Sequence, residues 1–139
     1  MIGLDTNVLA RYYLSEQDAD VATVRQQRAA QRLIEGDEAL YVAKSVMLEL
    51  EWVMRGAYGS NREEFASVLD HLLSSPHVTV EDRLSIEAAL AAHRNGLDFA
   101  DALHHATYRT CSWVASFDDR KLARRAQKLG LAPTVKVPR

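Results

Sequence analysis

The sequence predicts an α/β fold with a mostly parallel central sheet and helices on both of its faces. Short apolar runs alternate along the chain with longer segments in which apolar residues recur every three or four positions. Strands that alternate with helices favour a parallel sheet, because each parallel connection needs a crossover. A chain of 139 residues suits one buried core. Residues 1–139 are therefore expected to form a single domain, with no linker or internal repeat.

Five short apolar runs are the predicted strands, because each is too short for a helix and lies between helical segments. These runs are Ile2–Leu4, Leu40–Val42, Val78–Val80, Trp113–Ala115 and Thr134–Val137.

The segments between these strands are predicted helices, which begin at residues that favour N-caps and end near glycine, proline or asparagine. Where two capping residues stand close together, both remain candidates. The predicted helices run from Asn7 to about Leu14, from Asp18 or Asp20 to Gly36, from Val46 (capped by Ser45) to about Ala57, from Ser60 or Asn61 to the residue before Pro76, from Glu81 or Asp82 to Asn95, from Asp98 to about Thr110, and from Asp118 or Asp119 to Gly130.

The composition is that of an ordinary globular protein, with 47% hydrophobic and 26% charged residues. No apolar run reaches about 18 residues, the length that spans a membrane. The first residues reach Asp5 without the basic start and apolar stretch of a secretion signal. Cys111 is the only cysteine, so no disulfide can form within the chain, and we expect it to be a small buried residue. These features favour a reducing, cytoplasmic location and no membrane partner.

Charge is unevenly distributed along the chain. All 19 acidic residues precede position 120, whereas residues 120–139 hold seven of the 17 basic residues. A basic end of this kind would attract a polyanionic substrate. The alternative is that these lysines and arginines only solvate the surface.

Asp5 and Asp118 follow predicted strands, the first directly and the second three residues after Ala115. In open parallel sheets, binding sites form outside the carboxyl ends of the strands. Each acid could instead cap the helix that follows it, since aspartate is a favoured N-cap. Asp119 could also take the place of its neighbour Asp118.

Glu49 is placed by helical spacing at the edge of an apolar stripe. The expected stripe consists of Val46, Leu50, Val53, Met54 and Ala57. A carboxylate at this edge costs free energy unless it forms an ion pair or binds a cation. The same spacing places Glu51 well away from the stripe.

Asp98 and Asp101 stand three residues apart in the first turn of one predicted helix, so they share a face. Their mutual repulsion calls for a positive partner, and Mg²⁺ or Mn²⁺ prefers carboxylate oxygens. His104 and His105 follow, but a zinc site would need more histidine or cysteine ligands. We therefore expect both histidines to be structural.

The segments that carry these acids resemble the signature of the PIN domain, and together they resemble the VapC-type toxins of bacterial toxin–antitoxin pairs. The four segments are Ile-Gly-Leu-Asp5-Thr6-Asn7, Leu48-Glu49-Leu-Glu-Trp52-Val, Leu97-Asp98-Phe-Ala-Asp101-Ala-Leu-His104 and Ser116-Phe-Asp118. The resemblance extends from Met1 to about Leu129.

This resemblance implies a metal-dependent endoribonuclease that hydrolyses phosphodiester bonds of RNA. It implies that the ion ligands are Asp5, Glu49, Asp101 and Asp118, and that supporting positions are Thr6, Asn7, Asp98 and Ser116. It also implies a homodimer and a protein antitoxin that blocks the site. Leu48 and Trp52 lie off the predicted core stripe, so we expect one of these partners to bury them. Tyr12, Tyr13 and Trp52 are candidates for stacking on RNA bases.

Two other functions fit the same residues. One is a phosphoryl-transfer enzyme with an aspartyl nucleophile, which would need a lysine at another strand end, such as Lys44 or Lys121. The other is a non-catalytic acidic α/β binding module, in which the acids are helix caps and surface charges. Binding of Mn²⁺ separates the nuclease from the binding module.

Overall fold

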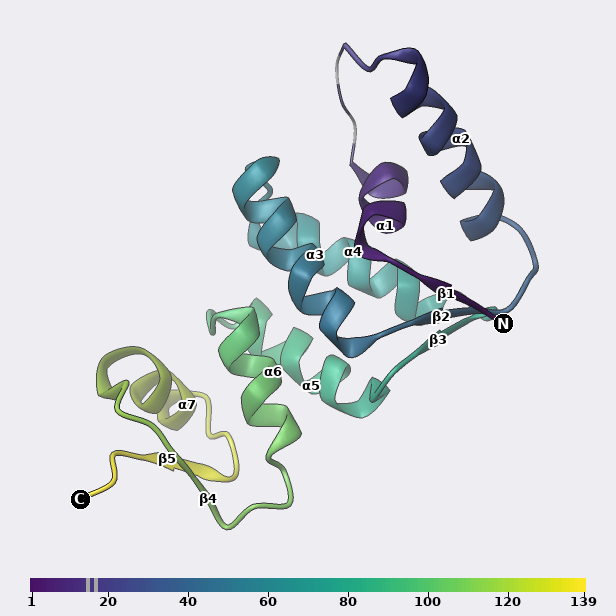
Figure 1. Ribbon diagram of the computed structural model, residues 1–139. Helices are drawn as coiled ribbons and strands as arrows, with labels where there is room; N and C mark the ends of the chain where they lie inside the picture. The colour runs from purple at the N-terminus through teal and green to yellow at the C-terminus, as the bar shows by residue number, and fades with distance from the viewer. Residues whose placement is uncertain (15, 17) are drawn as a thin grey trace. The chain divides into compact units, whose positions relative to one another are not determined.

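The first three strands form a parallel sheet in the computed structural model, which describes residues 1–14, 16 and 18–139 (Figure 1). The strands are β1 (Ile2–Leu4), β2 (Leu40–Val42) and β3 (Val78–Val80), and β2 lies in the centre. Leu4 is opposite Val42, and Val42 is opposite Val80. The carboxyl ends of the three strands therefore share one edge of the sheet.

Four helices accompany this sheet: α1 (Thr6–Tyr13), α2 (Val21–Ile34), α3 (Lys44–Ala57) and α4 (Arg62–Ser74). Asp20 caps α2 by accepting a hydrogen bond from the backbone N–H of Thr23 at 2.8 Å. Asn61 caps α4 in a capping box with Glu64, in which each side chain accepts from the other residue's backbone. The structure thus selects Asp20 over Asp18 and Asn61 over Ser60.

The start of α3 differs from the prediction, because Ser45 does not cap it. Ala43 occupies the N-cap position, and its side chain offers no acceptor. The backbone N–H of Lys44 instead donates to Oε1 of Glu81 at 2.7 Å. Glu81 directly follows β3, so a residue from the neighbouring strand replaces the local cap.

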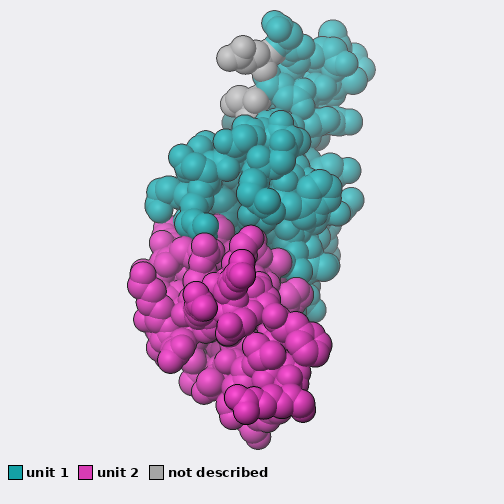
Figure 2. All heavy atoms as spheres, turned by 90° about the vertical axis from the view of Figure 1, so that its left-hand side faces the viewer, with its two compact units in different colours: residues 1–81 teal, residues 82–139 magenta. Residues whose placement is uncertain are grey.

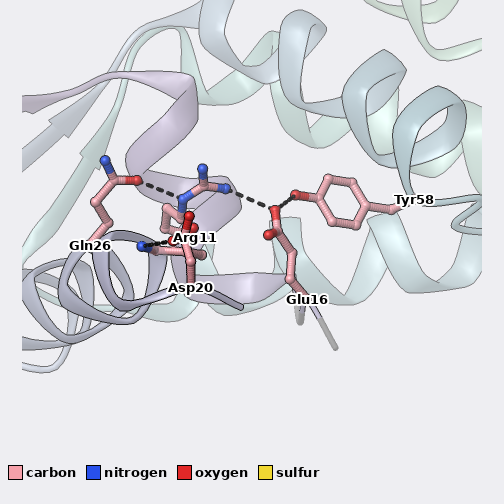
Figure 3. A network of polar contacts seen from close by, with 6 residues as sticks. Arg11, Glu16, Asp20, Gln26 and Tyr58 are labelled. Carbon is pink, nitrogen blue, oxygen red and sulfur yellow. Dashed lines mark hydrogen bonds and ion pairs between the residues drawn. The ribbon is translucent and has the colours of Figure 1, made fainter. Parts of the chain in front are cut away.

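A polar network around Arg11 connects α1 with α2, with Glu16, and with Tyr58 directly after α3 (Figure 3). Its guanidinium donates to Gln26 in α2 at 2.8 Å and to Glu16 at 3.2 Å, and the Tyr58 hydroxyl donates to the same carboxylate at 3.1 Å. The hydrogen bonds from Thr23, and then the charge of Arg11, hold the pKa of Asp20 below its usual value. The network links Arg11 of α1 to Gln26 of α2 and, through Glu16, to Tyr58.

The chain divides into two compact units, residues 1–81 and residues 82–139 (Figure 2). The second unit contains α5 (Arg83–Arg94), α6 (Phe99–Thr107), β4 (Trp113–Ala115), the π-helical turn η1 (Asp119–Ala123), α7 (Arg124–Lys128) and β5 (Thr134–Lys136). β4 and β5 form a two-stranded parallel sheet in which Ala115 is opposite Lys136. Ala123, Ala126 and Val135 form a small core beside this sheet.

The predicted α/β class with parallel strands is confirmed, and every predicted strand is present. Two details differ: the strands pair as two parallel sheets, and the last predicted helix begins as the π-helical turn η1. The expectation of a single domain stays a prediction. None of the helices in the described part of the chain is both long and apolar enough to cross a membrane.

Candidate functional site

Asp5 lies at the carboxyl end of β1 and caps α1. Its Oδ1 accepts a hydrogen bond from the backbone N–H of Thr6 at 2.8 Å, and the residue is exposed. The predicted capping role is therefore present in the structure. The cap uses one carboxylate oxygen, which leaves the second oxygen available to another partner.

Thr6 is buried, with 5% of its surface exposed. Among the described residues, its hydroxyl is the one buried side-chain polar atom without a hydrogen-bond partner. Leaving such a group unpaired costs about 1–3 kcal/mol. Asn7, the next residue, is exposed and lines a groove of about 270 Å³ between α1 and α2. The segment that follows β1 thus holds an unpaired hydroxyl beside a carboxylate.

Glu49 does not lie at the edge of the buried face of α3, so this part of the prediction was wrong. The buried residues of the helix are Met47, Leu50, Glu51 and Met54, whereas Glu49 is exposed. The spacing 47, 50, 51 and 54 is that of a regular apolar stripe with an acid in one position.

Glu51 can take that position because its charge is paired. Oε1 and Oε2 of Glu51 accept hydrogen bonds from Nε and Nη2 of Arg55, at 3.0 and 3.3 Å, one turn further along the helix. Glu49 itself is exposed, so its charge needs no cation to offset a cost of burial. Its role as an ion ligand rests on the sequence motif alone and stays a prediction.

The second unit brings Asp98, Asp101 and Asp118 into electrostatic range of one another. Asp98 caps α6, and its Oδ2 accepts from the backbone N–H of Asp101 at 3.1 Å. Burial, and then the charges of Asp98 and Asp118, raise the pKa of the half-buried Asp101 above its usual value. Electrostatic interactions with His104 and Lys121 act in the opposite direction on this pKa. Asp101 is thus a carboxylate in a locally negative environment.

Asp118 is held on both sides by hydrogen bonds. Its Oδ1 accepts from the backbone N–H of Lys121, and its own N–H donates to Oγ of Ser116, both at 3.0 Å. Ser116 is therefore a support for Asp118, and Asp118 is also a helix cap. Asp118, rather than Asp119, is one of the charges that raise the pKa of Asp101.

The two histidines of α6 differ in their surroundings. His105 is buried, and its Nε2 lies 2.8 Å from the carbonyl oxygen of Pro133. This contact gives His105 a structural role, as expected, whereas His104 is exposed. Within residues 1–14, 16 and 18–139, no three histidine, cysteine, aspartate or glutamate side chains are placed to hold a metal ion. The predicted set of four ligands stays a prediction.

Tyr12 and Tyr13 line a groove of about 670 Å³ in the first unit. The Tyr12 hydroxyl donates to Glu35 at 3.0 Å, and the Tyr13 hydroxyl shares a hydrogen bond with Nδ1 of His71. Burial, and then Tyr12, raise the pKa of Tyr13 above its usual value. Both hydroxyls are thus used inside the protein, which favours packing over RNA contact.

Two residues of the second unit differ from what the sequence suggested. Cys111 is exposed rather than buried. Phe117 is 83% exposed, and the sequence reasoning did not single it out. The available signal was an aromatic residue between two polar residues, Ser116 and Asp118, directly after a strand.

Carboxylates that follow parallel strands lie where such sheets bind ligands, and carboxylate oxygens can hold the metal ions that assist phosphate-ester hydrolysis. A family model of the PIN domain matches residues 2–128. The chain therefore belongs to the PIN domain family, whose members are generally metal-dependent nucleases. No curated protein matches the chain.

Proposed function

We propose that this protein is an endoribonuclease that depends on Mg²⁺ or Mn²⁺, with Asp5, Glu49, Asp101 and Asp118 as the ion ligands. The observation that carries the proposal is the position of Asp5 and Asp118 just after parallel strands, in a chain that the PIN family model matches over residues 2–128. Carboxylate oxygens are the ligands that both ions prefer.

Two features of the described residues fit such an ion. Burial, and then the charges of Asp98 and Asp118, raise the pKa of Asp101 and so disfavour its charged form, which a divalent cation would stabilise. The Thr6 hydroxyl, beside Asp5, is buried without a hydrogen-bond partner, and a ligand or an ion-bound water would satisfy it.

The residues divide into ligands and supports. When bound, a divalent ion activates water and neutralises the phosphate that is attacked. Asp5 and Asp101 would be the central ligands, and Glu49 and Asp118 the flanking ones. Asp98 orients Asp101 through the backbone of α6, and Ser116 holds Asp118. Thr6 and Asn7, which follow Asp5 in the sequence, would support the part of the ion site that lies next to Asp5.

We further propose that the protein is the toxin of a type II toxin–antitoxin pair, that it acts in the cytoplasm, and that it forms a homodimer. The support is an apolar surface on α3: Trp52 is 58% exposed, and Leu48, one turn earlier, is half-buried. A large aromatic side chain exposed beside a leucine favours burial by a protein partner. The antitoxin would neutralise the toxin by covering its active site.

RNA-end sequencing after induced expression tests this function. New RNA ends should appear with the wild type and be absent with Asp5→Asn, which keeps a capping side chain at α1. Asp118→Asn should also lose the ends, whereas Asp119→Asn, the neighbouring exposed acid, should keep them. Purified wild type should produce the same ends with Mn²⁺ and none with a chelator. Ends that persist in Asp5→Asn would contradict the proposal.

A non-catalytic binding module is the second candidate, because Asp5, Asp98 and Asp118 all act as helix caps. Calorimetric titration with Mn²⁺ separates the two functions. Saturable binding that Asp101→Asn weakens supports the nuclease. Absence of binding in the wild type, together with absence of RNA cleavage, supports the module.

A further inference from the structure

A groove of about 550 Å³ lies at the carboxyl edge of the β4–β5 sheet. It is formed by residues that follow or end the two strands, Phe117, Lys136 and Arg139, and by residues of η1 and α7, Asp119, Arg124 and Gln127. We call it the basic groove. The carboxyl edge is where parallel α/β sheets bind ligands.

Phe117 is presented by a fixed backbone. The N–H of Ser116 donates to the carbonyl of Lys136 at 3.0 Å, which ties the loop to β5. The carbonyl of Phe117 accepts from the N–H of Asp119, also at 3.0 Å. The ring is nevertheless 83% exposed. A large apolar side chain on a hydrogen-bonded loop therefore faces the solvent at the groove.

The charge of the groove is positive, because Arg124, Lys136 and Arg139 outnumber the single acid Asp119. The ammonium of Lys136 lies 5.4 Å from the centre of the Trp113 ring, within the range of a cation–π contact. Arg125, next to Arg124, instead donates to the carbonyl of Gly96 at 3.0 Å. The basic C-terminal segment thus contains both groove cations and a structural arginine.

We propose that the basic groove binds single-stranded RNA, with one base stacked on Phe117 and the flanking phosphates against Arg124, Lys136 and Arg139. A cationic groove with an exposed aromatic ring is the arrangement that binds single strands, because an unpaired base offers its face to the ring. The inference rests on the proposed function, since Phe117 directly precedes Asp118. The stacked base would belong to a nucleotide near the cleaved bond.

Binding of a labelled single-stranded RNA oligonucleotide to the full-length protein, in chelator, tests the stacking. Phe117→Ala should weaken binding at least about fivefold, the lower range for loss of one stacked base. Phe117→Tyr, which keeps the ring, should restore it. Phe117→Leu keeps an apolar side chain without an aromatic face and should bind as weakly as the alanine variant. Equal binding by all four proteins would overturn the proposal.

Salt dependence tests the phosphate contacts. Arg124→Ala should lower the slope of log affinity against log salt by about 0.7, the value for one phosphate contact with a single strand. Lys128→Ala removes the same charge from the same helix outside the groove lining, so its slope should stay near that of the wild type. Equal slopes for the two variants would show that the groove has no special role.

Two further measurements separate this inference from its rivals and from the proposed nuclease. Vesicles that contain an anionic lipid should not bind the protein through Phe117. Vesicle binding that Phe117→Ala abolishes, without any binding of RNA, would overturn the RNA assignment. Cleavage with Mn²⁺ is measured on the same proteins. Cleavage by the wild type with Phe117-independent binding refutes the groove alone. Phe117-dependent binding without cleavage refutes the nuclease alone.

Discussion

Asp101 lies in the first turn of α6, where burial and the charges of Asp98 and Asp118 raise its pKa. A group with a raised pKa in the folded state adds relative stability at low pH, and this is lost as pH rises through the folded pKa. Without metal, Asp101→Asn should therefore unfold at a higher temperature than the wild type at neutral pH. The difference should vanish below the pKa of the unfolded acid. Thermal melts in chelator across this range measure it.

The same variant should lose RNA cleavage by at least about 100-fold, since even supporting residues of metal sites cost about 10–100-fold when changed. Asp37→Asn is the control, because it removes an exposed acid outside the predicted ligands and the basic groove and should alter neither the melt nor the cleavage rate. A variant of Asp101 that melts lower and still cuts RNA would show that this residue serves only the helix.

Thr6 offers a second test, because its buried hydroxyl has no partner among the described residues. Thr6→Val keeps the shape and removes the hydroxyl, so the metal-free protein should gain about 1 kcal/mol or more in free energy of unfolding. Its affinity for Mn²⁺ should fall. Thr6→Ser keeps the hydroxyl and should retain the affinity. Urea denaturation and calorimetry provide the two readouts, and a destabilised valine variant would contradict the idea.

The acids that follow the strands were predictable from the sequence, whereas the buried face of α3 was not. Asp5 and Asp118 stand where the sequence order of strand and acid predicts. The predicted stripe left Glu51 outside it, so the exposure of Glu49 was missed. Glu51 lies on the buried face because its charge is paired with Arg55, and hydrophobic spacing alone does not register such pairing.

Among the helices, α4 has the most complete local start signal, and its capping box can be tested. Asn61→Ala should lower the free energy of unfolding by about 1 kcal/mol, because the N–H of Glu64 loses its acceptor. Ser60→Ala is the matched control: Ser60 was the other candidate cap, and its removal should have little effect. Equal losses in urea denaturation would show that the box contributes nothing specific.

Helix starts were predictable where the cap is local and unpredictable where it is distant. Asp20 and Asn61 lie within three residues of the N–H groups that they accept from. The cap of α3, in contrast, comes from Glu81, which is 37 residues from Lys44. The π-helical start of η1 was also missed, because periodicity indicates a helix without distinguishing its hydrogen-bond pattern.

The whole chain is expected to associate through α3. If the homodimer buries Trp52, then Trp52→Asp should shift the protein from dimer to monomer in analytical ultracentrifugation. Leu84→Asp is a suitable control, since Leu84 is 68% exposed on α5 and has no predicted partner role. A wild type that sediments as a monomer, without its antitoxin, would remove the basis for the dimer.

The α/β class followed from the alternation of strands and helices, whereas the pairing of the strands did not. Each strand has only three residues, and its neighbours are determined by hydrogen bonds to segments far along the chain. Sequence periodicity indicates which face of a strand is buried, but it does not say which strands are neighbours in a sheet. The division into a three-stranded and a two-stranded parallel sheet is therefore a result that only the structure provides.

The hydrogen bond between Glu81 and the start of α3 sets the earliest point at which this helix can be capped as the chain is synthesised. Glu81 is the last residue of the first unit, and its carboxylate is the acceptor for the N–H of Lys44. During translation, domains fold as units from the N-terminus as residues leave the ribosome. The helix that bears Glu49 therefore emerges with its first turn uncapped and acquires its cap only when the final residue of that unit is free. The nascent chain thus completes this half of the protein at a defined point in its own synthesis.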